Sequence, residues 1–424
     1  MTREMKDSGI PWIGEIPENW EVKRLKQESI FINGFAFDSE EFKIDEGVRV
    51  IRIGDIGLKA DFENCVRAIT NSSILKPYRI EDGDILIAMS GATTGKCCIV
   101  DKSEEAYINQ RVGIIRSDIR KIIYYSLQTP YFMEFVNLNN AGSAQPNISS
   151  KAIGEFPILS IPTTEQQRIA EFLDRKCAEV DEMIALQEQI IEELKAYKQS
   201  VITEAVTKGL NPAAPKRDSG IEWIGQIPEH WEVKRLKQES TFINGFAFDS
   251  EEFKIDVGIK VIRIGDIGLQ VDFENCVRAT TDASLLSSYK IADGDILIAM
   301  SGATTGKCCI VEKAEEAYIN QRVGIIRSDV RKLIYYSLLT PYFMEFVNLN
   351  NAGSAQPNIS SKAIGEFPII IMPPTEQQSI ADYLDEKCAD IDSIIQTKQS
   401  KIDSLKEYKK SIIYEYVTGK REVE

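Results

Sequence analysis

The sequence predicts an α+β protein with two near-identical globular α+β domains, separated by two long helices that pair as an antiparallel coiled coil about an approximate twofold axis. Two observations predict this arrangement. The chain repeats itself at an offset of 211 residues, so each copy is a unit of domain size. Each copy also divides into a part with short strand-like runs and a long part without Pro or Gly. The predicted boundaries are residues 1–161 (head 1), 162–209 (first helix), 210–372 (head 2) and 373–424 (second helix).

Length and composition are those of a multidomain globular protein. The 424 residues are 43% hydrophobic and 27% charged, and no apolar run has the length of a membrane span. The first residues lack the apolar core of a signal peptide, which predicts a cytoplasmic location. The net charge of −15 excludes a chain that is basic throughout, but separate parts can still bind nucleic acid and protein.

The cysteines and the single histidine predict no metal site. Cys97–Cys98 and Cys308–Cys309 are adjacent pairs without zinc-ligand spacing, and only His230 could complete a cluster. We therefore expect buried, reduced thiols.

The heads predict a compact α+β core. Runs such as VRVIRIGDI, DILIAM and RVGIIR have strand character and are separated by Gly-containing turns. One helix is predicted over residues 120–138, whose aromatic side chains recur at helical spacing and face the core. Between residues 31–157 and 242–368 the heads differ at 18 of 127 aligned positions, and AGSAQPNISSKAIGEFP is identical in both.

Each head is followed by a long helix. The segments IPTTEQQ and MPPTEQQ space Thr164 with Gln167, and Thr375 with Gln378, as capping boxes after proline. No Pro or Gly interrupts residues 165–208 or 376–418. At about 1.5 Å per residue, each helix is roughly 65 Å long.

A heptad pattern predicts that the helices pair. Apolar residues lie seven or fourteen apart, with further apolar residues three positions after them. The first row is Leu173, Val180, Leu194, Val201, Leu384, Ile391, Leu405 and Ile412, and the interleaved row is Met183, Ile190, Tyr197, Ile394 and Tyr408. Gln187 and Lys398 interrupt the first row at equivalent places. Because antiparallel rods meet at their midpoints, we expect these two residues to lie near each other and to set the register. Two separate amphipathic helices, each on its own head, are the alternative.

The stretch SGATTGK at residues 90–96, repeated at 301–307, resembles a phosphate-binding loop. Only three residues separate Gly91 from Gly95, however, and Cys97 occupies the place of the magnesium-binding hydroxyl. The flanking runs DILIAM and CCIV predict strands, so no helix N-terminus follows to hold a nucleotide phosphate. The stretch therefore predicts a strand–turn–strand unit, either a purely structural turn or a loop that approaches another polyanion.

Three stretches resemble one family. They are DSGIPWIGEIPENWEVKRL with its repeat DSGIEWIGQIPEHWEVKRL, then GDILIAMSGATTGK, then QPNISSKAIGEFPI followed by PTTEQQRIAEFLD or PPTEQQSIADYLD. Together they resemble the specificity subunit of type I DNA restriction–modification systems, over nearly the whole chain. The family's order of head, helix, head and helix is the order of this chain.

The resemblance implies a function. Each head would be a target recognition domain for one half of a split DNA site, and the helices would set the spacing and dock two methyltransferase subunits. Those partners would carry S-adenosylmethionine and methylate adenine N6, and ATP- and Mg-dependent motor–nuclease subunits would join them where present. The specificity subunit itself would have no catalytic role and no bound cofactor. In agreement, the sequence holds no Asn/Asp-Pro-Pro-Tyr/Phe motif of an adenine methyltransferase.

Residue type and loop context predict three DNA-contacting clusters in each head. Phosphates are bound by Lys, Arg, hydroxyls and backbone N–H groups, and base edges by Arg, Asn and Gln. The alternatives are structural turns and, for Asn147, a helix cap. The clusters of head 1 are Thr93, Thr94 and Lys96; Asn109, Gln110 and Arg111; and Gln145, Asn147 and Lys151. Those of head 2 are Thr304, Thr305 and Lys307; Asn320, Gln321 and Arg322; and Gln356, Asn358 and Lys362.

Near-identical heads depart from the usual family pattern, in which the two heads differ. Two identical heads in inverted orientation predict an interrupted palindrome. The differences Arg49/Lys260, Lys59/Gln270, Lys76/Ser287 and Arg79/Lys290 would change phosphate contacts or one base at most. A freestanding two-headed DNA-binding protein, or a scaffold that binds protein only, is the alternative function.

Overall fold

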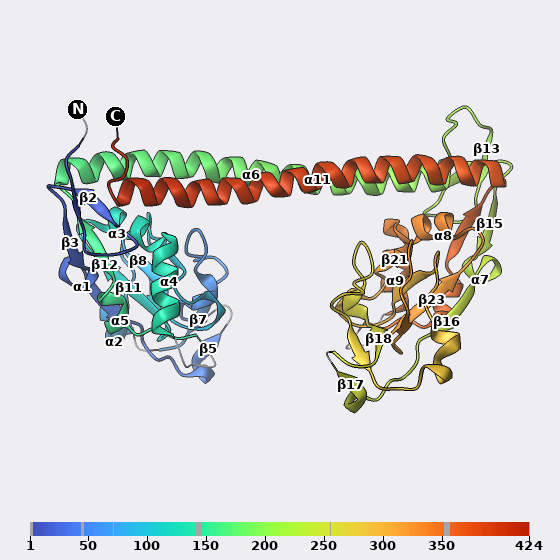
Figure 1. The fold of residues 1–424 in the computed structure, drawn as a ribbon, viewed down its shortest axis with the longest axis horizontal. Coiled ribbons are helices and arrows are strands. Elements are labelled where there is room, and N and C mark those ends of the chain that lie inside the picture. The colour runs from blue at the N-terminus through green and yellow to red at the C-terminus, as the bar shows by residue number, and fades with distance from the viewer. Residues whose placement is uncertain are drawn as a thin grey trace. The chain divides into compact units, whose positions relative to one another are not determined.

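The computed structural model describes residues 3–43, 46–70, 72–140, 146–254, 256–351 and 357–423. The chain divides into two compact units, and each holds one head with parts of both long helices. Unit 1 is Met1–Glu188 with Ser400–Glu424, and unit 2 is Gln189–Gln399. In Figure 1 head 1 is drawn in blue to cyan and head 2 in yellow to orange.

Head 1 is built on two four-stranded sheets. The first has the order β4-β11-β8-β9 and is antiparallel throughout; the second has the order β10-β6-β7-β5 and contains one parallel pair, β10 with β6. The strands of the first are β4 (Ile30–Asn33), β8 (Ile85–Ala88), β9 (Cys97–Ile99) and β11 (Val112–Arg116). Those of the second are β5 (Phe42–Lys43), β6 (Val48–Ile51), β7 (Val66–Ala68) and β10 (Ala106–Ile108). Two smaller sheets pair β1 (Met5–Asp7) with β2 (Glu15–Pro17), and β3 (Glu21–Arg24) with β12 (Pro157–Ser160).

The first sheet is buried on both faces. Along β8, Ile85 and Ile87 point into one apolar cluster, and Leu86 and Ala88 point into another, because successive side chains of a strand alternate between faces. The helices of the head contribute to its apolar clusters: Phe132, for example, belongs to the first cluster and Leu75 to a third one. They are α1 (Leu25–Glu28), α2 (Ser72–Leu75), α3 (Arg120–Leu127), α4 (Pro130–Asn139) and α5 (Ser150–Gly154).

The single helix predicted over residues 120–138 is wrong: α3 and α4 are separate helices. Pro130 is the first residue of α4, and Thr129 before it is extended, with ψ of 149°. Proline lacks the N–H that would continue the helix, and its ring keeps the preceding residue out of the helical conformation. The Thr129 hydroxyl donates to the Ser126 carbonyl at 2.7 Å and closes the break.

Head 2 repeats these elements. Its antiparallel sheet has the order β16-β23-β20-β21 and its mixed sheet the order β17-β19-β18-β22. The strands are β13 (Lys216–Asp218), β14 (Gln226–Pro228), β15 (Glu232–Arg235), β16 (Thr241–Asn244), β17 (Phe253–Lys254), β18 (Ile259–Ile262), β19 (Val277–Ala279), β20 (Ile296–Ala299), β21 (Cys308–Ile310), β22 (Ala317–Ile319), β23 (Val323–Arg327) and β24 (Pro368–Ile371). The helices are α7 (Leu236–Glu239), α8 (Arg331–Leu338), α9 (Pro341–Asn350) and α10 (Ser361–Gly365).

The long helices are α6 (Thr163–Lys208) and α11 (Pro374–Val417). The predicted capping boxes are wrong, because Thr164 and Thr375 lie inside the first turn. The carbonyl of Pro162 already accepts the N–H groups of Glu165 and Gln166, at 2.9 Å each, so the helix begins before Thr164. No helix of the described chain, these two included, has the length and apolarity to cross a membrane.

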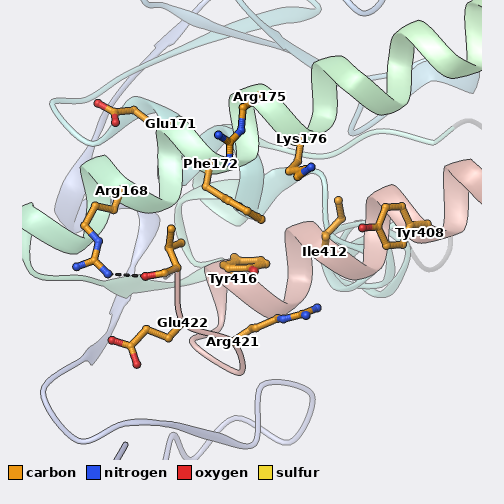
Figure 2. A pocket seen from close by; sticks show the side chains of 11 residues that line it. Arg168, Glu171, Phe172, Arg175, Lys176, Tyr408, Ile412, Tyr416, Arg421 and Glu422 are labelled. Atoms are coloured by element: carbon orange, nitrogen blue, oxygen red, sulfur yellow. Dashed lines mark hydrogen bonds between the residues drawn. The ribbon is translucent and has the colours of Figure 1, made fainter.

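Within each unit the two helices run antiparallel, as predicted. In unit 1 Phe172 stacks near Tyr416, with ring centroids 4.3 Å apart, and Asp181 pairs with Lys409 at 2.7 Å; Figure 2 shows the aromatic pair between the helices. In unit 2 Lys198 pairs with Asp392 at 2.7 Å. One apolar cluster there holds Ile202 and Val206 of α6 together with Ile380, Leu384 and Cys388 of α11.

The first row of the predicted seam faces the partner helix, but the interleaved row is wrong. Leu173 and Val180 are buried, whereas Met183 and Tyr197 are 43% and 58% exposed. The buried interleaved residues follow the first row by four positions instead of three; they are Cys177, Ile191, Cys388 and Ile402. Ile394 and Tyr408, predicted at the seam, are exposed. The sequence did not distinguish the two interleaved rows, because both contain apolar residues. The row that is buried also contains Lys198 and Lys409, and their ion pairs with Asp392 and Asp181 depend on the partner helix.

Gln187 and Lys398 lie in different units, so their proximity stays a prediction. Gln187 is buried, and its side-chain oxygen has no hydrogen-bond partner within the described residues. Lys398 is half-buried. A buried polar residue in a helix seam destabilises the pair but restricts its register.

Candidate nucleic-acid interface

The SGATTGK stretch is a turn between two strands, as predicted. It joins β8 to β9 through a short 3₁₀ turn at Gly91–Thr93, and the Gly95 N–H donates to the Ala88 carbonyl at 2.8 Å. Gly91 and Gly95 have φ of 77° and 86°, a left-handed conformation that favours glycine. A Cβ on Gly95 would lie 2.9 Å from the Met133 sulfur. Close packing on α4 therefore also requires glycine here.

The threonines of this turn have structural contacts. Thr94 is buried, and its hydroxyl lies 2.7 Å from the Gly91 carbonyl oxygen and 3.3 Å from that of Pro146. Thr305 makes the same contacts to Gly302 and Pro357. These hydroxyls hold the turn to the loop before α5 or α10, and contact with DNA stays a prediction for them. Thr93 and Thr304 are half-buried, while Lys96 and Lys307 extend from the turn and are exposed.

The structure brings the three predicted clusters of head 1 together. The Gly91 N–H donates to the Pro146 carbonyl at 2.9 Å, and Ser90 and Asn147 form a β-bridge. On the other side, the Met89 N–H donates to the Arg111 carbonyl at 2.9 Å. The Arg111 guanidinium donates to the Ser90 hydroxyl at 3.4 Å. The turn, Arg111 and the segment around Asn147 therefore form one continuous surface, which we call the reading surface of head 1 after the DNA contacts predicted for it.

The reading surface of head 2 repeats these contacts. The Gly302 N–H donates to the Pro357 carbonyl at 2.9 Å, and Ser301 pairs with Asn358 in a β-bridge. The Arg322 guanidinium donates to the Ser301 hydroxyl at 3.0 Å. Ser90 and Ser301 were missed as members of the surface, because the contact that orients the arginine spans 21 residues of sequence and joins two strands.

The middle cluster is the turn between β10 and β11. The Val112 N–H donates to the Asn109 carbonyl at 2.8 Å, and the Asn109 N–H donates to the Ile51 carbonyl. Gly34 lies so close to this turn that a Cβ would come within 2.0 Å of the Asn109 oxygen. The backbone of the turn is thus fixed, while the Gln110 and Arg111 side chains are exposed.

The third cluster precedes α5. The Ser149 hydroxyl, and not Asn147, caps this helix by accepting the Ala152 N–H at 3.1 Å. The Asn147 side chain is therefore exposed without a capping role, and Lys151 is exposed on α5. Asn358 and Lys362 are exposed in the same places in head 2. Gln145 and Gln356 lie outside the described residues.

The cations of the reading surfaces have few interactions with carboxylates; the pKa of Glu366 is lowered chiefly by its hydrogen bond with Lys237 and to a smaller extent by the charge of Lys362. Other arginines and lysines of the heads form ion pairs, such as Arg116 with Asp84 at 2.7 Å. The side-chain hydrogen bond from Arg116 to Asp84 raises the pKa of Arg116. In the described parts of the heads, by contrast, no ion pair involves the six cations Lys96, Arg111, Lys151, Lys307, Arg322 and Lys362. On a chain with a net charge of −15, such a surface favours a polyanion.

The cysteines are free thiols, as predicted. Cys98 and Cys309 lie in the core on β9 and β21, and burial raises the pKa of each to about 12. Within the described chain no three His, Cys, Asp or Glu side chains are grouped to bind a metal ion.

A groove on the helices of unit 1 was not predicted. This groove, of about 900 Å³, is lined by α6, the end of α11 and the segment that follows it. Figure 2 shows Phe172, Tyr416 and Ile412 on its floor, with Arg168 donating to the Val423 carbonyl. At the equivalent positions to Arg168 and Arg175, unit 2 has Ser379 and Glu386. The groove is thus more basic than the same face of unit 2.

Comparisons with known proteins identify the family. Residues 17–196 and 228–419 match the family described as "Type I restriction modification DNA specificity domain". The type I restriction enzyme MjaVIII specificity subunit of Methanocaldococcus jannaschii is 25% identical over 429 residues, covering 96% of this chain and 93% of that protein. The EcoKI specificity subunit of Escherichia coli is 25% identical over 409 residues, covering 90% and 84%.

A solved chain from work on complex assembly and conformational transition of the type I R-M system has the same fold. Its TM-score is 0.68 at 16% identity, and the match covers 95% of this chain and 98% of the other. The family matches cover both heads and most of both long helices. The chain therefore belongs to the DNA specificity subunits of type I restriction–modification systems, which are non-catalytic members of those complexes.

Proposed function

We propose that this chain reads an interrupted palindromic DNA site, one half-site per head, and positions two adenine-N6 methyltransferase subunits on it. One observation carries the proposal: the described residues of the two reading surfaces are identical in sequence, and the arginine of each is held by the same serine contact. Ser90 orients Arg111 in head 1 as Ser301 orients Arg322 in head 2. Since sequence readout depends on such side chains at base edges, identical surfaces favour identical half-sites.

The surfaces have the chemistry that DNA requires. Exposed Arg111 and Gln110 stand on a fixed turn, as bidentate contacts to guanine and adenine demand. Lys96 and Lys151 flank them as unpaired cations, and such cations bind phosphate and fix the register of the protein on the duplex.

The differences between the heads spare these contacts. Arg49 pairs with Glu104 at 2.9 Å, and its counterpart Lys260 pairs with Glu315 at the equivalent position. Lys290, the counterpart of Arg79, pairs with Glu316 at 3.3 Å. The exchange of Arg49 for Lys260 keeps a local ion pair away from the reading surface, which supports a common half-site.

The partners supply the chemistry. We propose that S-adenosylmethionine is bound by the two methyltransferase subunits, and that ATP and Mg are used by motor–nuclease subunits where the complex has them. This chain would contribute recognition and spacing only, in the cytoplasm where host DNA is methylated.

The test is a methylation map. The chain is co-expressed with its methyltransferase partner in a host without type I systems, and N6-methyladenine is mapped by long-read sequencing. A split motif equal to its own reverse complement is expected. A split but asymmetric motif would show that the heads read different half-sites, and absence of new methylation by a soluble, associated complex would contradict the proposal.

The matched controls use the reading surfaces. Arg111→Ala with Arg322→Ala should abolish methylation of the motif. Lys26→Ala with Lys237→Ala removes exposed lysines that pair with Glu155 and Glu366 and should leave the motif unchanged. Methylation that survives loss of both arginines would remove the middle cluster from the reading surface.

A further inference from the structure

Each head is attached to its long helix through a carboxylate. In unit 1 Asp174 of α6 accepts a hydrogen bond from the Tyr125 hydroxyl at 2.6 Å and forms an ion pair with Lys121. Both partners lie on α3 of the head. In unit 2 Asp385 of α11 makes the same contacts, with Tyr336 at 2.6 Å and with Lys332.

The tyrosine is the firmer partner of each carboxylate. Burial, followed by the hydrogen bond to Asp174, raises the pKa of Tyr125, so the hydroxyl stays protonated and donates at any physiological pH. Lys121 and Asp174 are 44% and 39% exposed, and water therefore weakens their ion pair. Burial, followed by the hydrogen bond to Asp385, raises the pKa of Tyr336 in unit 2 in the same way.

A second carboxylate holds the same head at the start of the helix. Glu165 accepts from the Trp20 indole N–H at 3.0 Å and from the Asn19 amide at 3.1 Å. Glu376 accepts from the Trp231 indole at 3.0 Å. Two attachment points, 9 residues apart on the helix, restrict rotation of the head more than one point can.

The hydrogen bonds to these carboxylates are directional, whereas the apolar contacts between head and helix are not. The head also packs on the helices through an apolar cluster that includes Trp20, Ile122 and Leu173, and this burial supplies most of the adhesion. Hydrophobic contact is non-directional, whereas a hydrogen bond requires a defined donor–acceptor geometry. The carboxylates therefore fix the angle at which the head sits.

The attached helix is continuous with the reading surface. Arg111 directly precedes β11, β11 ends at Arg116, and α3 begins at Arg120. The Ser117 hydroxyl between them donates to the Glu28 carbonyl at 2.5 Å. A change in the angle of α3 on α6 is thereby transmitted to Arg111 through three residues and one strand.

We propose that Asp174 and Asp385 are positioning residues that set the tolerance of the spacer between the two half-sites. The inference rests on the proposed function, in which each head reads one half-site. The long helices determine the average spacing, and the two carboxylates restrict how far each head departs from it. The sequence holds a signal for this role: Asp174 and Asp385 are identical, although α6 and α11 differ at half of the positions between 163–206 and 374–417.

The experiment maps methylation by complexes of the wild-type chain and of Asp174→Ala, Asp385→Ala and the double variant. Methylation of sites whose spacer is one base pair longer or shorter should rise about tenfold over wild type, the factor expected when one charge-assisted hydrogen bond is lost. The half-site sequences should stay the same. A role in folding alone would lower methylation at all sites without changing the spacer.

The controls separate the alternatives. Glu171→Ala with Asp382→Ala removes exposed carboxylates from the same helices, where Asp382 accepts from Gln378 of its own helix, and should not change the spacer. Tyr125→Phe with Tyr336→Phe removes the donors and keeps the aspartates, and it should relax the spacer even if the aspartate variants do not fold. An unchanged spacer in the tyrosine and aspartate variants overturns the inference. Absence of a split motif with the wild-type chain overturns the proposed function itself.

Discussion

The two heads differ at 18 of 127 aligned positions between residues 31–157 and 242–368, whereas the helices differ at 22 of 44 positions between 163–206 and 374–417. Most helix differences lie on exposed faces. The buried seam residues Leu173 and Cys177 recur as Leu384 and Cys388, and the ion pair of Asp181 with Lys409 recurs as Asp392 with Lys198. The comparison teaches that residue identity is retained over most of each head. In the helices it is retained mainly at buried seam positions and at the carboxylates that hold the heads.

The groove on the helices of unit 1 is a region in which the two units differ in sequence. Arg168 and Arg175 line the groove of unit 1, and Ser379 and Glu386 replace them in unit 2. The two units, whose heads are nearly identical, therefore present different residues on this part of their helices.

The largest loss of stability should come from truncating a buried leucine of the helix seam, and it should be equal in both units. Leu173→Ala and Leu384→Ala each remove a fully buried side chain and should lower the unfolding free energy of their own unit by about 3 kcal/mol. Hydrogen exchange resolved by unit measures this. Leu186→Ala, at a position that is 52% exposed, should have almost no effect, and unequal losses at Leu173 and Leu384 would show that the seams are not equivalent.

The next effect tests the equivalence of the heads in recognition. Arg111→Ala or Arg322→Ala alone should weaken binding of the complex to its methylated motif by roughly 10- to 100-fold, because one bidentate base contact is lost. Fluorescence anisotropy on a duplex with that motif measures it. The two single variants should be equal on a palindrome, and a much larger loss from one of them would reveal unequal half-sites.

The ion pairs of the seam should contribute less. Lys198→Ala and Lys409→Ala should each cost at most about 1 kcal/mol, since their aspartate partners are 41% and 37% exposed and water screens the pair. Thermal unfolding measures the loss. Exchanging the charges within a pair, as in Lys198→Asp with Asp392→Lys, should restore most of it, and failure to do so would mean that the lysines stabilise by packing.

The smallest effect concerns acid pH. Burial alone would raise the pKa of Glu165, but hydrogen bonds from Arg3, Asn19 and Trp20 outweigh it and lower the pKa below 4.5. A lowered pKa means that Glu165 stabilises the fold above the pKa of the unfolded chain and loses this contribution as the pH falls through the folded value. Glu165→Gln should therefore reduce the stability of unit 1 at pH 7 by less than about 1 kcal/mol and by less at pH 3. A difference that grows toward low pH would contradict this.

The sequence by itself determined the repeat, the order of head and helix, and the strand–turn–strand character of SGATTGK. Each of these is local: Pro and Gly interrupt helices, and alternating apolar runs form strands wherever they occur. The same local chemistry explains Pro130, whose effect on the helix at residues 120–138 could have been read from the sequence. The exposed side chains at Arg111, Lys96 and Asn147 were also identified by type and context.

Only the tertiary structure decided which side chains meet. The seam has apolar residues at two spacings, and the row that is buried depends on the partner helix, where Asp392 and Asp181 accept Lys198 and Lys409. Ser90 joins the reading surface through a hydrogen bond to Arg111, and Asp174 holds the head through Tyr125 on another element. Such contacts join residues that are distant along the chain. Hydrogen bonds and ion pairs require particular atoms within about 3 Å, and a one-dimensional pattern contains no distances between elements.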